Sequence, residues 1–387
     1  MSRDLFLVTL SLLTWGIGEG MFFNFQSLYL RELGANPLLI GKIFGAVGIC
    51  MALSHIPAGY LSDRVGRRPL LWAAWFLGLV ATWCMALEKS LPIFVAGMLL
   101  YGITAFVMAP LSSYVTAARG RLSIRRALSF IGISFSIGAI VGPLLGGWIG
   151  DRVGLHQTYL VAACIFILSS IIILFIRPQP IEHAAHHEKR RGLHLDLYYF
   201  IFLGIVFLAV FSTYLPQPLT PNYLQSEYSL SYNQIGFLTA MISVGNVVMN
   251  LIFGHIDARL GFLVGQGAVA AFALLIWQGS GLPWFTLAYF LVGGHRAART
   301  MATAQTRQLV KESAMGLAYG ITEMVNSTGV ILASPLAGYI YEQNPAWVYA
   351  ISLGLIIISI IAGAIFLFAR HEIRSTSPTM GDTLPGS

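Results

Sequence analysis

The stretch Gly59-Tyr60-Leu61-Ser62-Asp63-Arg64-Val65-Gly66-Arg67-Arg68-Pro69-Leu70-Leu71 decides the fold of this chain. It is polar and charged, and it lies between two long hydrophobic segments. Because charged side chains enter hydrocarbon only at a high free-energy cost, we predict that the stretch forms a loop on one side of a membrane. Its glycines suit a tight turn between two closely packed helices.

The second half of the chain contains a diverged copy, Gly254-His255-Ile256-Asp257-Ala258-Arg259-Leu260-Gly261. Gly59, Arg64 and Gly66 align with Gly254, Arg259 and Gly261, and an Ile-Gly pair precedes both copies at the same spacing. Asp63 aligns with Ala258, and the acid of the copy comes one place earlier, at Asp257. The chain therefore carries two related halves, as many transporters do.

The composition is that of a membrane protein. Of the 387 residues, 56% are apolar and 10% are charged, whereas soluble domains carry roughly 25% charged residues. A spanning helix needs about 20 apolar residues, which predicts twelve spans at about 5–30, 37–61, 69–87, 91–116, 127–149, 155–176, 196–222, 232–256, 262–280, 283–306, 315–340 and 346–369. The predicted fold is an all-α membrane protein with twelve transmembrane helices in two pseudo-symmetric six-helix bundles.

The charge distribution predicts the orientation. Placing the N-terminus in the cytoplasm leaves only Arg31, Lys89 and Arg152 on the other side. The cytoplasmic segments then hold seventeen cations, a strong positive-inside bias: Arg3, Arg64, Arg67, Arg68, Arg119, Arg121, Arg125, Arg126, Arg177, Lys189, Arg190, Arg191, Arg259, Arg307, Lys311, Arg370 and Arg374. We thus expect both termini in the cytoplasm and assign the net charge of +7 to topology rather than to nucleic-acid binding.

The predicted bundles are 1–176 and 195–370, with a cytoplasmic linker at 177–194 and a disordered tail at 371–387. The linker contains His183, His186 and His187, for which a solvated, flexible segment is favoured over a metal site. No cofactor and no metal are expected.

Two motifs resemble a known family. The stretch at Gly59 resembles the loop between helices 2 and 3 of the major facilitator superfamily of transporters. The fifth span resembles the G-x3-GP-x2-GG pattern in helix 5 of the family's drug and metabolite antiporters, with Gly138, Gly142, Pro143, Gly146 and Gly147. Small residues four apart let membrane helices approach closely, and the proline permits a bend.

The resemblance implies six-plus-six helices, a central cavity lined mainly by helices 1, 4, 7 and 10, and alternating access. It also implies a conformational latch at Gly59, Asp63, Arg64, Gly66, Arg67 and Arg68. The acid equivalent to Asp63 is taken in the family to stabilise the outward-open state near the N-terminus of helix 11, where a carboxylate is favoured. The arginines are either its partners or anchors to anionic headgroups.

Ionic groups inside predicted spans are the candidate functional residues, because each costs about 3 kcal/mol or more near the bilayer centre. Glu19 lies halfway along the first span, where burial favours its neutral form, and it is a candidate for proton coupling or substrate binding. Gln26, seven residues further, is expected on the same face. A structural ion pair is the alternative for Glu19.

Arg296 and Arg299 lie three apart in the tenth span, with Thr303 on the same stripe. They are expected to line a cavity and to contact an anionic or polar substrate, or to pair with Glu19 or Glu323. Glu323, in the eleventh span beside Asn326, is either a proton carrier or an arginine partner.

Tyr101 in the fourth span, and Tyr214 and Gln217 in the seventh, are candidate substrate contacts, although packing is an equal alternative for the aromatic rings. One departure from the family pattern concerns proton coupling. Many proton-coupled antiporters of the family carry an arginine in helix 4 at the position of Met98. Its duty would then fall to Arg296 or Arg299, or to another route.

The leading functional prediction is a monomeric secondary transporter of the bacterial cytoplasmic membrane that exports an amphipathic or partly anionic small molecule in exchange for protons. The alternatives are an organic-anion importer or uniporter, a lysolipid translocator, and a non-transporting membrane receptor. An enzyme is disfavoured, because the sequence contains no HExxH, CxxC or GxSxG motif and no phosphate loop after a strand.

Overall fold

The computed structural model describes residues 2–87, 89–179, 197–310 and 315–376, with side chains except at 56–64, 308, 316, 317 and 367–376. All regular secondary structure in these ranges is helical. Ten helical segments there are long and apolar enough to span a bilayer. Two predicted spans remain. The tenth consists of α13 and the arginine-containing α14, and the eleventh is α15.

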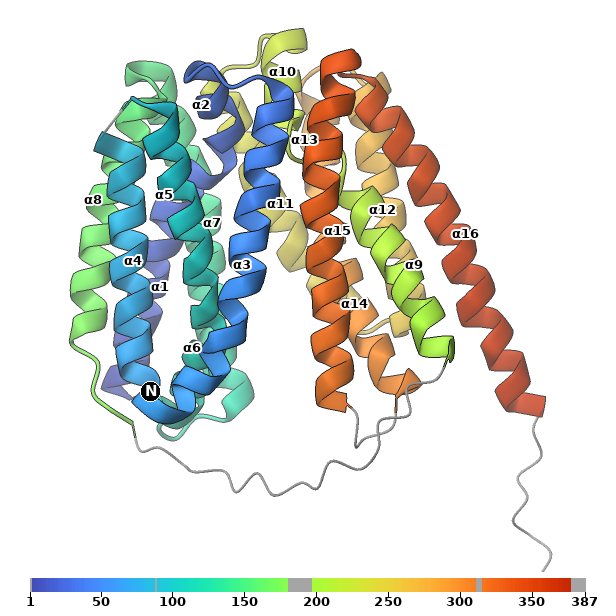
Figure 1. Ribbon diagram of the computed structural model, residues 1–387, viewed down its shortest axis with the longest axis horizontal. Helices are drawn as coiled ribbons and strands as arrows, with labels where there is room; N and C mark the ends of the chain where they lie inside the picture. Colours follow the sequence, from blue (N-terminus) through green and yellow to red (C-terminus); the bar gives the residue numbers. More distant parts are fainter. Residues whose placement is uncertain (1, 88, 180–196, 311–314, 377–387) are drawn as a thin grey trace, which may run out of the picture.

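The N-terminal half forms one bundle and the C-terminal half a second one beside it (Figure 1). The N-terminal elements are α1 (Arg3–Phe22), η1 (Phe23–Phe25), α2 (Gln26–Glu32), α3 (Pro37–Val65), α4 (Arg67–Leu87), α5 (Leu91–Ile103), η2 (Thr104–Val107), α6 (Met108–Ala118), α7 (Ile124–Val153) and α8 (Leu155–Leu174). The C-terminal elements are α9 (Leu197–Tyr214), α10 (Thr220–Tyr228), α11 (Tyr232–Phe253), α12 (Ala258–Gln278), α13 (Leu282–Leu291), α14 (Gly294–Leu309), α15 (Met315–Gln343) and α16 (Trp347–Thr376).

Two predicted segments fall partly outside the described residues. The histidines of the linker all lie in 180–196, and the end of the tail lies in 377–387. The start of the tail was predicted too early, because α16 continues as a helix to Thr376.

The first, fourth, seventh and tenth spans are each broken, which corrects the continuous helices predicted for them. The short 3-10 helices η1 and η2 interrupt the first and fourth spans. Pro216 and Pro218 lie in the break between α9 and α10, and Gly293 lies in the break between α13 and α14. Proline removes a backbone donor and glycine lowers helix propensity. Broken helices are tolerated at membrane depth where protein buries them or where they line a water-filled space.

The prediction of a loop at Gly59-Leu71 was wrong. The chain stays helical through Val65, turns at Gly66 and is helical again from Arg67. Gly66 has φ +84° and ψ 167°, a conformation that L side chains rarely adopt, so one glycine makes the whole turn. The polar residues before and after it occupy helix ends rather than a loop.

The copy in the second half turns at a different place. Here α11 ends at Phe253, and Asp257 accepts a hydrogen bond from the backbone N–H of Arg259 (2.8 Å) as the N-cap of α12. The Arg259 side chain also donates to this carboxyl (3.1 Å) and holds the pKa of Asp257 below its usual range. Gly261, the counterpart of Gly66, lies inside α12. The acid of the copy therefore caps a helix, whereas Asp63 lies inside one.

The glycines of α7 permit backbone contact with α1, as the fifth-span motif predicted. A Cβ on Gly142 would lie 2.4 Å from the carbonyl oxygen of Ile17, and one on Gly146 would lie 2.5 Å from that of Met21. Gly147 faces the other half instead, where a Cβ would lie 2.4 Å from the carbonyl oxygen of Tyr232. The motif thus joins α7 to α1 within one bundle and to α11 of the other.

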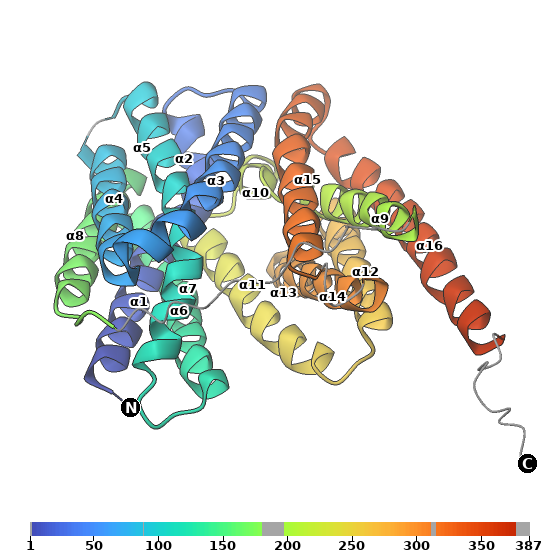
Figure 2. The same ribbon diagram turned by 60° about the horizontal axis from the view of Figure 1, so that its bottom comes forward.

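The two ends of the molecule differ. The end that carries Arg3, Arg67 and Arg177 is called the basic face, and the end that carries Asp151 and Glu342 is called the opposite face. In Figure 1 the basic face is at the bottom, where the two bundles diverge, and the opposite face is at the top, where they meet. Figure 2 shows the two bundles side by side with α3, α7, α11 and α15 between them.

Carboxylates close the opposite face in a pseudo-symmetric pair. Asp151 of α7 accepts hydrogen bonds from the backbone N–H groups of Tyr232 (2.7 Å) and Asn233 (3.0 Å), at the start of α11 in the other half. Glu342 of α15 accepts one from the N–H of Leu38 (3.2 Å), at the start of α3. Each half therefore supplies a carboxylate to a helix N-terminus of its partner, where negative charge is stabilised.

The same helices separate toward the basic face. The innermost hydrogen bond between the halves among the described residues joins Ser243 to the carbonyl of Ala139 (3.1 Å). Beyond it, large apolar side chains of α7 and α11 are exposed, including Ile133 and Leu251. The region between the halves on this side is called the inter-half space.

Alanine at Gly142 is expected to destabilise the bundle by about 1–3 kcal/mol, the usual cost of overpacking. The added methyl would meet backbone atoms of both Ile17 and Gly20, which cannot rotate away. Gly132 of the same helix is the matched control, because a Cβ there meets nothing within 4 Å. Thermal unfolding of purified protein should show a lower Tm for Gly142→Ala and no loss for Gly132→Ala; equal Tm values would contradict the close-packing account.

Candidate functional site

Glu19 is directed by the glycines that flank it. Gly18 packs against the ring of Phe166 in α8, and Gly20 packs against Pro143 in α7, each without room for a side chain. These contacts hold two sides of α1 against its neighbours. The half-buried Glu19 carboxyl extends instead toward Tyr101, which belongs to the fourth span.

Two aromatic donors hold one oxygen of this carboxyl. The Tyr101 hydroxyl donates to Oε2 at 2.8 Å, and the indole Nε1 of Trp15 donates to the same oxygen at 2.9 Å. Oε1 has no hydrogen-bond partner among the described residues. Glu19 is thus positioned as a carboxylate with one saturated oxygen and one available oxygen.

Trp15 was missed by the sequence analysis. It lies one turn before Glu19, and that i, i+4 spacing was the available signal. Its ring packs between Trp75 (centroids 4.9 Å apart) and Phe166 (4.6 Å), so it is buried and its orientation is fixed. Trp15 is therefore a positioning residue rather than a substrate contact.

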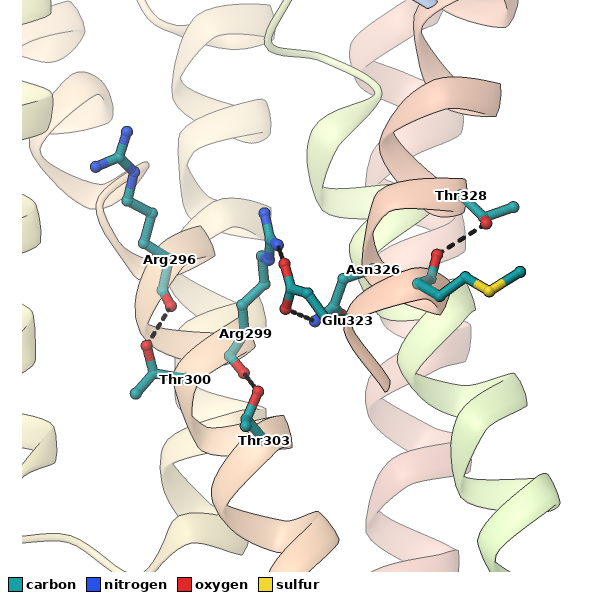
Figure 3. A network of polar contacts seen from close by, with 8 residues as sticks. Arg296, Arg299, Thr300, Thr303, Glu323, Asn326 and Thr328 are labelled. Carbon is teal, nitrogen blue, oxygen red and sulfur yellow. Dashed lines mark hydrogen bonds and ion pairs between the residues drawn. The ribbon is translucent and has the colours of Figure 1, made fainter. Parts of the chain in front are cut away.

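Arg299 forms an ion pair with Glu323 of α15, as one of the two sequence hypotheses proposed (Figure 3). Asn326, fully buried, donates to the second oxygen of Glu323 at 3.1 Å. The Arg299 side chain is 31% exposed and that of Glu323 is 57% exposed. The pair thus joins α14 to α15 and stays partly exposed.

Arg296 is exposed and points away from that pair (Figure 3). Its guanidinium makes no ion pair or hydrogen bond with any residue that the structure describes. It lies close enough to Glu19 of the other half for a charge–charge attraction, without reaching ion-pair distance. The two opposite charges therefore attract each other across the boundary between the halves without direct contact.

His295 is buried beside these arginines. Its Nδ1 shares a hydrogen bond with the hydroxyl of Thr213 in α9 (2.9 Å), and its ring lies 5.9 Å from that of Tyr214. Gln217, in the break after α9, donates to the carbonyl oxygen of Thr213 (2.7 Å). Of the predicted contacts, Tyr214 thus packs against His295 of α14 and Gln217 bonds within its own span; both are half-buried.

Other predicted site residues are placed less favourably. Gln26 is buried at the start of α2, where η1 interrupts the helical register that placed it beside Glu19. The Thr303 hydroxyl donates to the carbonyl oxygen of Arg299 in its own helix (3.1 Å), so its proton is already used. Met98 is buried in α5, and as an uncharged residue it supplies no positive charge to Glu19.

The latch cannot be assembled from the described side chains. Asp63 and Arg64 lie outside the residues whose side chains the structure describes. The guanidinium of Arg68 stacks over the ring of Trp72, 3.9 Å from its centroid, within its own half. Arg67 is half-buried at the start of α4. The latch therefore stays a prediction.

Paired six-helix bundles with broken helices and ionic groups between them define a membrane transporter. The sequence profile of the Major Facilitator Superfamily matches residues 6–203 and 202–384, so the chain belongs to that family. The fold prediction is confirmed, and the family consists of transporters rather than enzymes.

Similar proteins include the inner membrane transport protein YajR of Escherichia coli K12, 26% identical over 361 residues, which are 84% of this chain and 77% of that protein. The class B tetracycline resistance protein of Escherichia coli is 24% identical over 392 residues, covering 94% of this chain and 96% of that protein. The crystal structure of the nucleoside transporter NupG matches with a TM-score of 0.80 at 14% identity, over 94% of this chain and 99% of that one. That structure supports the fold alone.

A double-mutant cycle should measure the Arg299–Glu323 pair. We expect Arg299→Gln and Glu323→Gln to be coupled by about 1 kcal/mol, the upper range for exposed ion pairs. Arg296→Gln combined with Glu323→Gln is the control, with a coupling near zero because Arg296 points elsewhere. Thermal unfolding of the purified variants gives both values, and equal coupling in the two cycles would contradict the geometry.

Proposed function

We propose that this transporter exports an amphipathic, partly anionic small molecule in exchange for protons. The observation that carries the proposal is the Glu19 carboxyl, which two aromatic donors hold in one half and which attracts Arg296 of the other, an arginine without an ion-pair partner among the described residues. A carboxyl group at membrane depth can alternate between a charged and a protonated form. Each change alters the attraction between the halves, which links proton binding to their movement.

Arg296 is the proposed contact for the anionic group of the substrate. Arg299 is less available to the substrate, because it forms an ion pair with Glu323. An exposed guanidinium without a partner favours a ligand that supplies an acceptor. Two similar proteins are named for resistance to drugs, the class B tetracycline resistance protein and multidrug resistance protein 2 of Bacillus subtilis. These names support export over import.

The proposed location is the bacterial cytoplasmic membrane, with both termini and the basic face in the cytoplasm. The excess of lysine and arginine on that face supports this orientation. The bundles then meet on the outer side and diverge on the inner side, which corresponds to an inward-open arrangement. The proposed working unit is a monomer, because each chain contains both halves of its own site.

Glu19→Gln is expected to abolish substrate flux driven by a proton gradient, because glutamine keeps the shape and cannot exchange a proton. The measurement is uptake of a fluorescent drug into inside-out vesicles with an imposed pH gradient. Flux that stays at the parent level would remove Glu19 from the coupling mechanism.

Right-side-out vesicles provide the control for direction. Accumulation there, and not in inside-out vesicles, would favour an importer of organic anions over an exporter. Equal, gradient-independent movement in both would indicate a uniporter or lipid translocator. A matched Glu227→Gln variant should behave as the parent, because Glu227 makes no hydrogen bond or ion pair with the described residues.

Asp151→Ala combined with Glu342→Ala is expected to open the opposite face. The change leaves three backbone N–H groups without their acceptors across the closed boundary. Ser27 is 3% exposed there, so its cysteine variant reports opening by maleimide labelling in a background without native cysteines. We expect labelling to rise about tenfold or more, since each lost charged hydrogen bond is worth about 1.5–3 kcal/mol.

The control for opening is Glu227→Ala, which removes an acid of the same face without removing a contact between the halves. Faster labelling in the control, or no change in the double variant, would show that the two carboxylates do not hold the halves together.

A further inference from the structure

Glu19 and Arg296 are opposite charges from different halves, and each retains unused bonding capacity. Both donors to Glu19 reach Oε2, which leaves Oε1 free among the described residues. Arg296 is exposed, and its guanidinium has no hydrogen-bond or ion-pair partner there. By contrast, Arg299 is already paired with Glu323. Among the described charged groups of this region, Glu19 therefore offers a free acceptor and Arg296 offers free donors.

The two groups attract each other without touching. Each contributes an electrostatic interaction to the other, yet they form no ion pair. They belong to separate bundles, so closer contact requires either movement of the bundles or a change of the Arg296 rotamer. A ligand placed between them can instead contact both while the bundles stay apart.

The charge of such a ligand follows from this arrangement. A purely anionic ligand binds Arg296 but is repelled by an ionised Glu19, and a purely cationic ligand meets the reverse problem. A ligand with both charges satisfies the free oxygen and the free guanidinium together. Phe23 lies one turn beyond Glu19 and is 43% exposed, so it is the proposed apolar contact for the body of the ligand.

We infer that the substrate class is dipolar: an apolar body that carries a protonated amine, bound by Oε1 of Glu19, and an anionic group, bound by Arg296. This inference rests on the proposed transport function and narrows its substrate from partly anionic to zwitterionic. Protonation of Glu19 then removes the amine contact and leaves the anionic contact in place, so release begins at the amine end.

Three probes with one body test the inference. Nε-dansyl-lysine carries both charges, its methyl ester carries only the cation, and its Nα-acetyl derivative carries only the anion. Binding to the purified full-length protein is measured by dansyl fluorescence at pH 7 and constant ionic strength. We expect the zwitterion to bind about tenfold tighter than either relative, because each relative lacks one charge-assisted hydrogen bond.

Single substitutions should then change the order of the probes. In Glu19→Gln the zwitterion and the Nα-acetyl derivative should bind equally, and in Arg296→Gln the zwitterion and the methyl ester should bind equally. Arg307→Gln is the matched control, because Arg307 is an exposed arginine of the same helix outside the site, and it should keep the parent order.

The parent protein alone can overturn the inference, whatever the folding of the variants. Equal binding of the anion-only probe and the zwitterion would do so, and so would binding of none of the three. The proposed function is tested by a different measurement: it fails if a proton gradient drives no substrate flux in vesicles. The expected probe order without proton-driven flux would keep the dipolar site and reject the coupling.

Discussion

An ionic group in the middle of a bilayer is stable only beside an opposite charge, strong hydrogen-bond donors or water, and this constraint organises the molecule. Glu19 has two aromatic donors, and Arg299 has Glu323. Arg296 has neither among the described residues, and the attraction of the distant Glu19 carboxylate is its one favourable charge interaction given there. These charges are therefore compatible with a bilayer only where the region between the two bundles is polar at their level.

Close helix packing determines where that space lies. Glycines let α1 contact α7 backbone to backbone, and this contact leaves Glu19 one free direction. The same kind of contact joins the halves: Cβ atoms on Gly41 and Gly338 would lie 2.4 Å from carbonyl oxygens of the facing helix. The carboxylates Asp151 and Glu342 then close the outer ends of these interfaces. Contact is thus concentrated at one end, and the ionic residues lie where it stops.

Much of the fold could be predicted from the sequence, because hydrophobic length and glycine spacing are local signals. The breaks in four spans were not predicted, since a 3-10 turn such as η1 has no strong sequence signal of its own. The turn at Gly66 was predicted as a loop, because the charged residues were taken to mark the end of the helix. A helix can, however, continue beyond the membrane and carry charged residues there. The two half-copies also turn at different places, after Val65 in the first and after Phe253 in the second.

The charged residues of the site could be predicted from the sequence, but which of them pair with each other could not. Glu19, Arg296, Arg299 and Glu323 are conspicuous because ionic residues are rare in spans. Which of two arginines pairs with Glu323 depends on the rotation of α14 relative to α15, which follows from tertiary packing. Gln26 was misplaced for a similar reason, since the break in the first span changes the register beyond it.

The hydrogen bond from the indole of Trp15 to Glu19 has a practical consequence. Indole fluorescence responds to the charge of a group that is hydrogen-bonded to its nitrogen, so the emission of Trp15 should report whether the Glu19 carboxyl is ionised. The chain contains eight tryptophans, and a version that keeps Trp15 alone would let fluorescence follow the ionisation of a single residue during turnover.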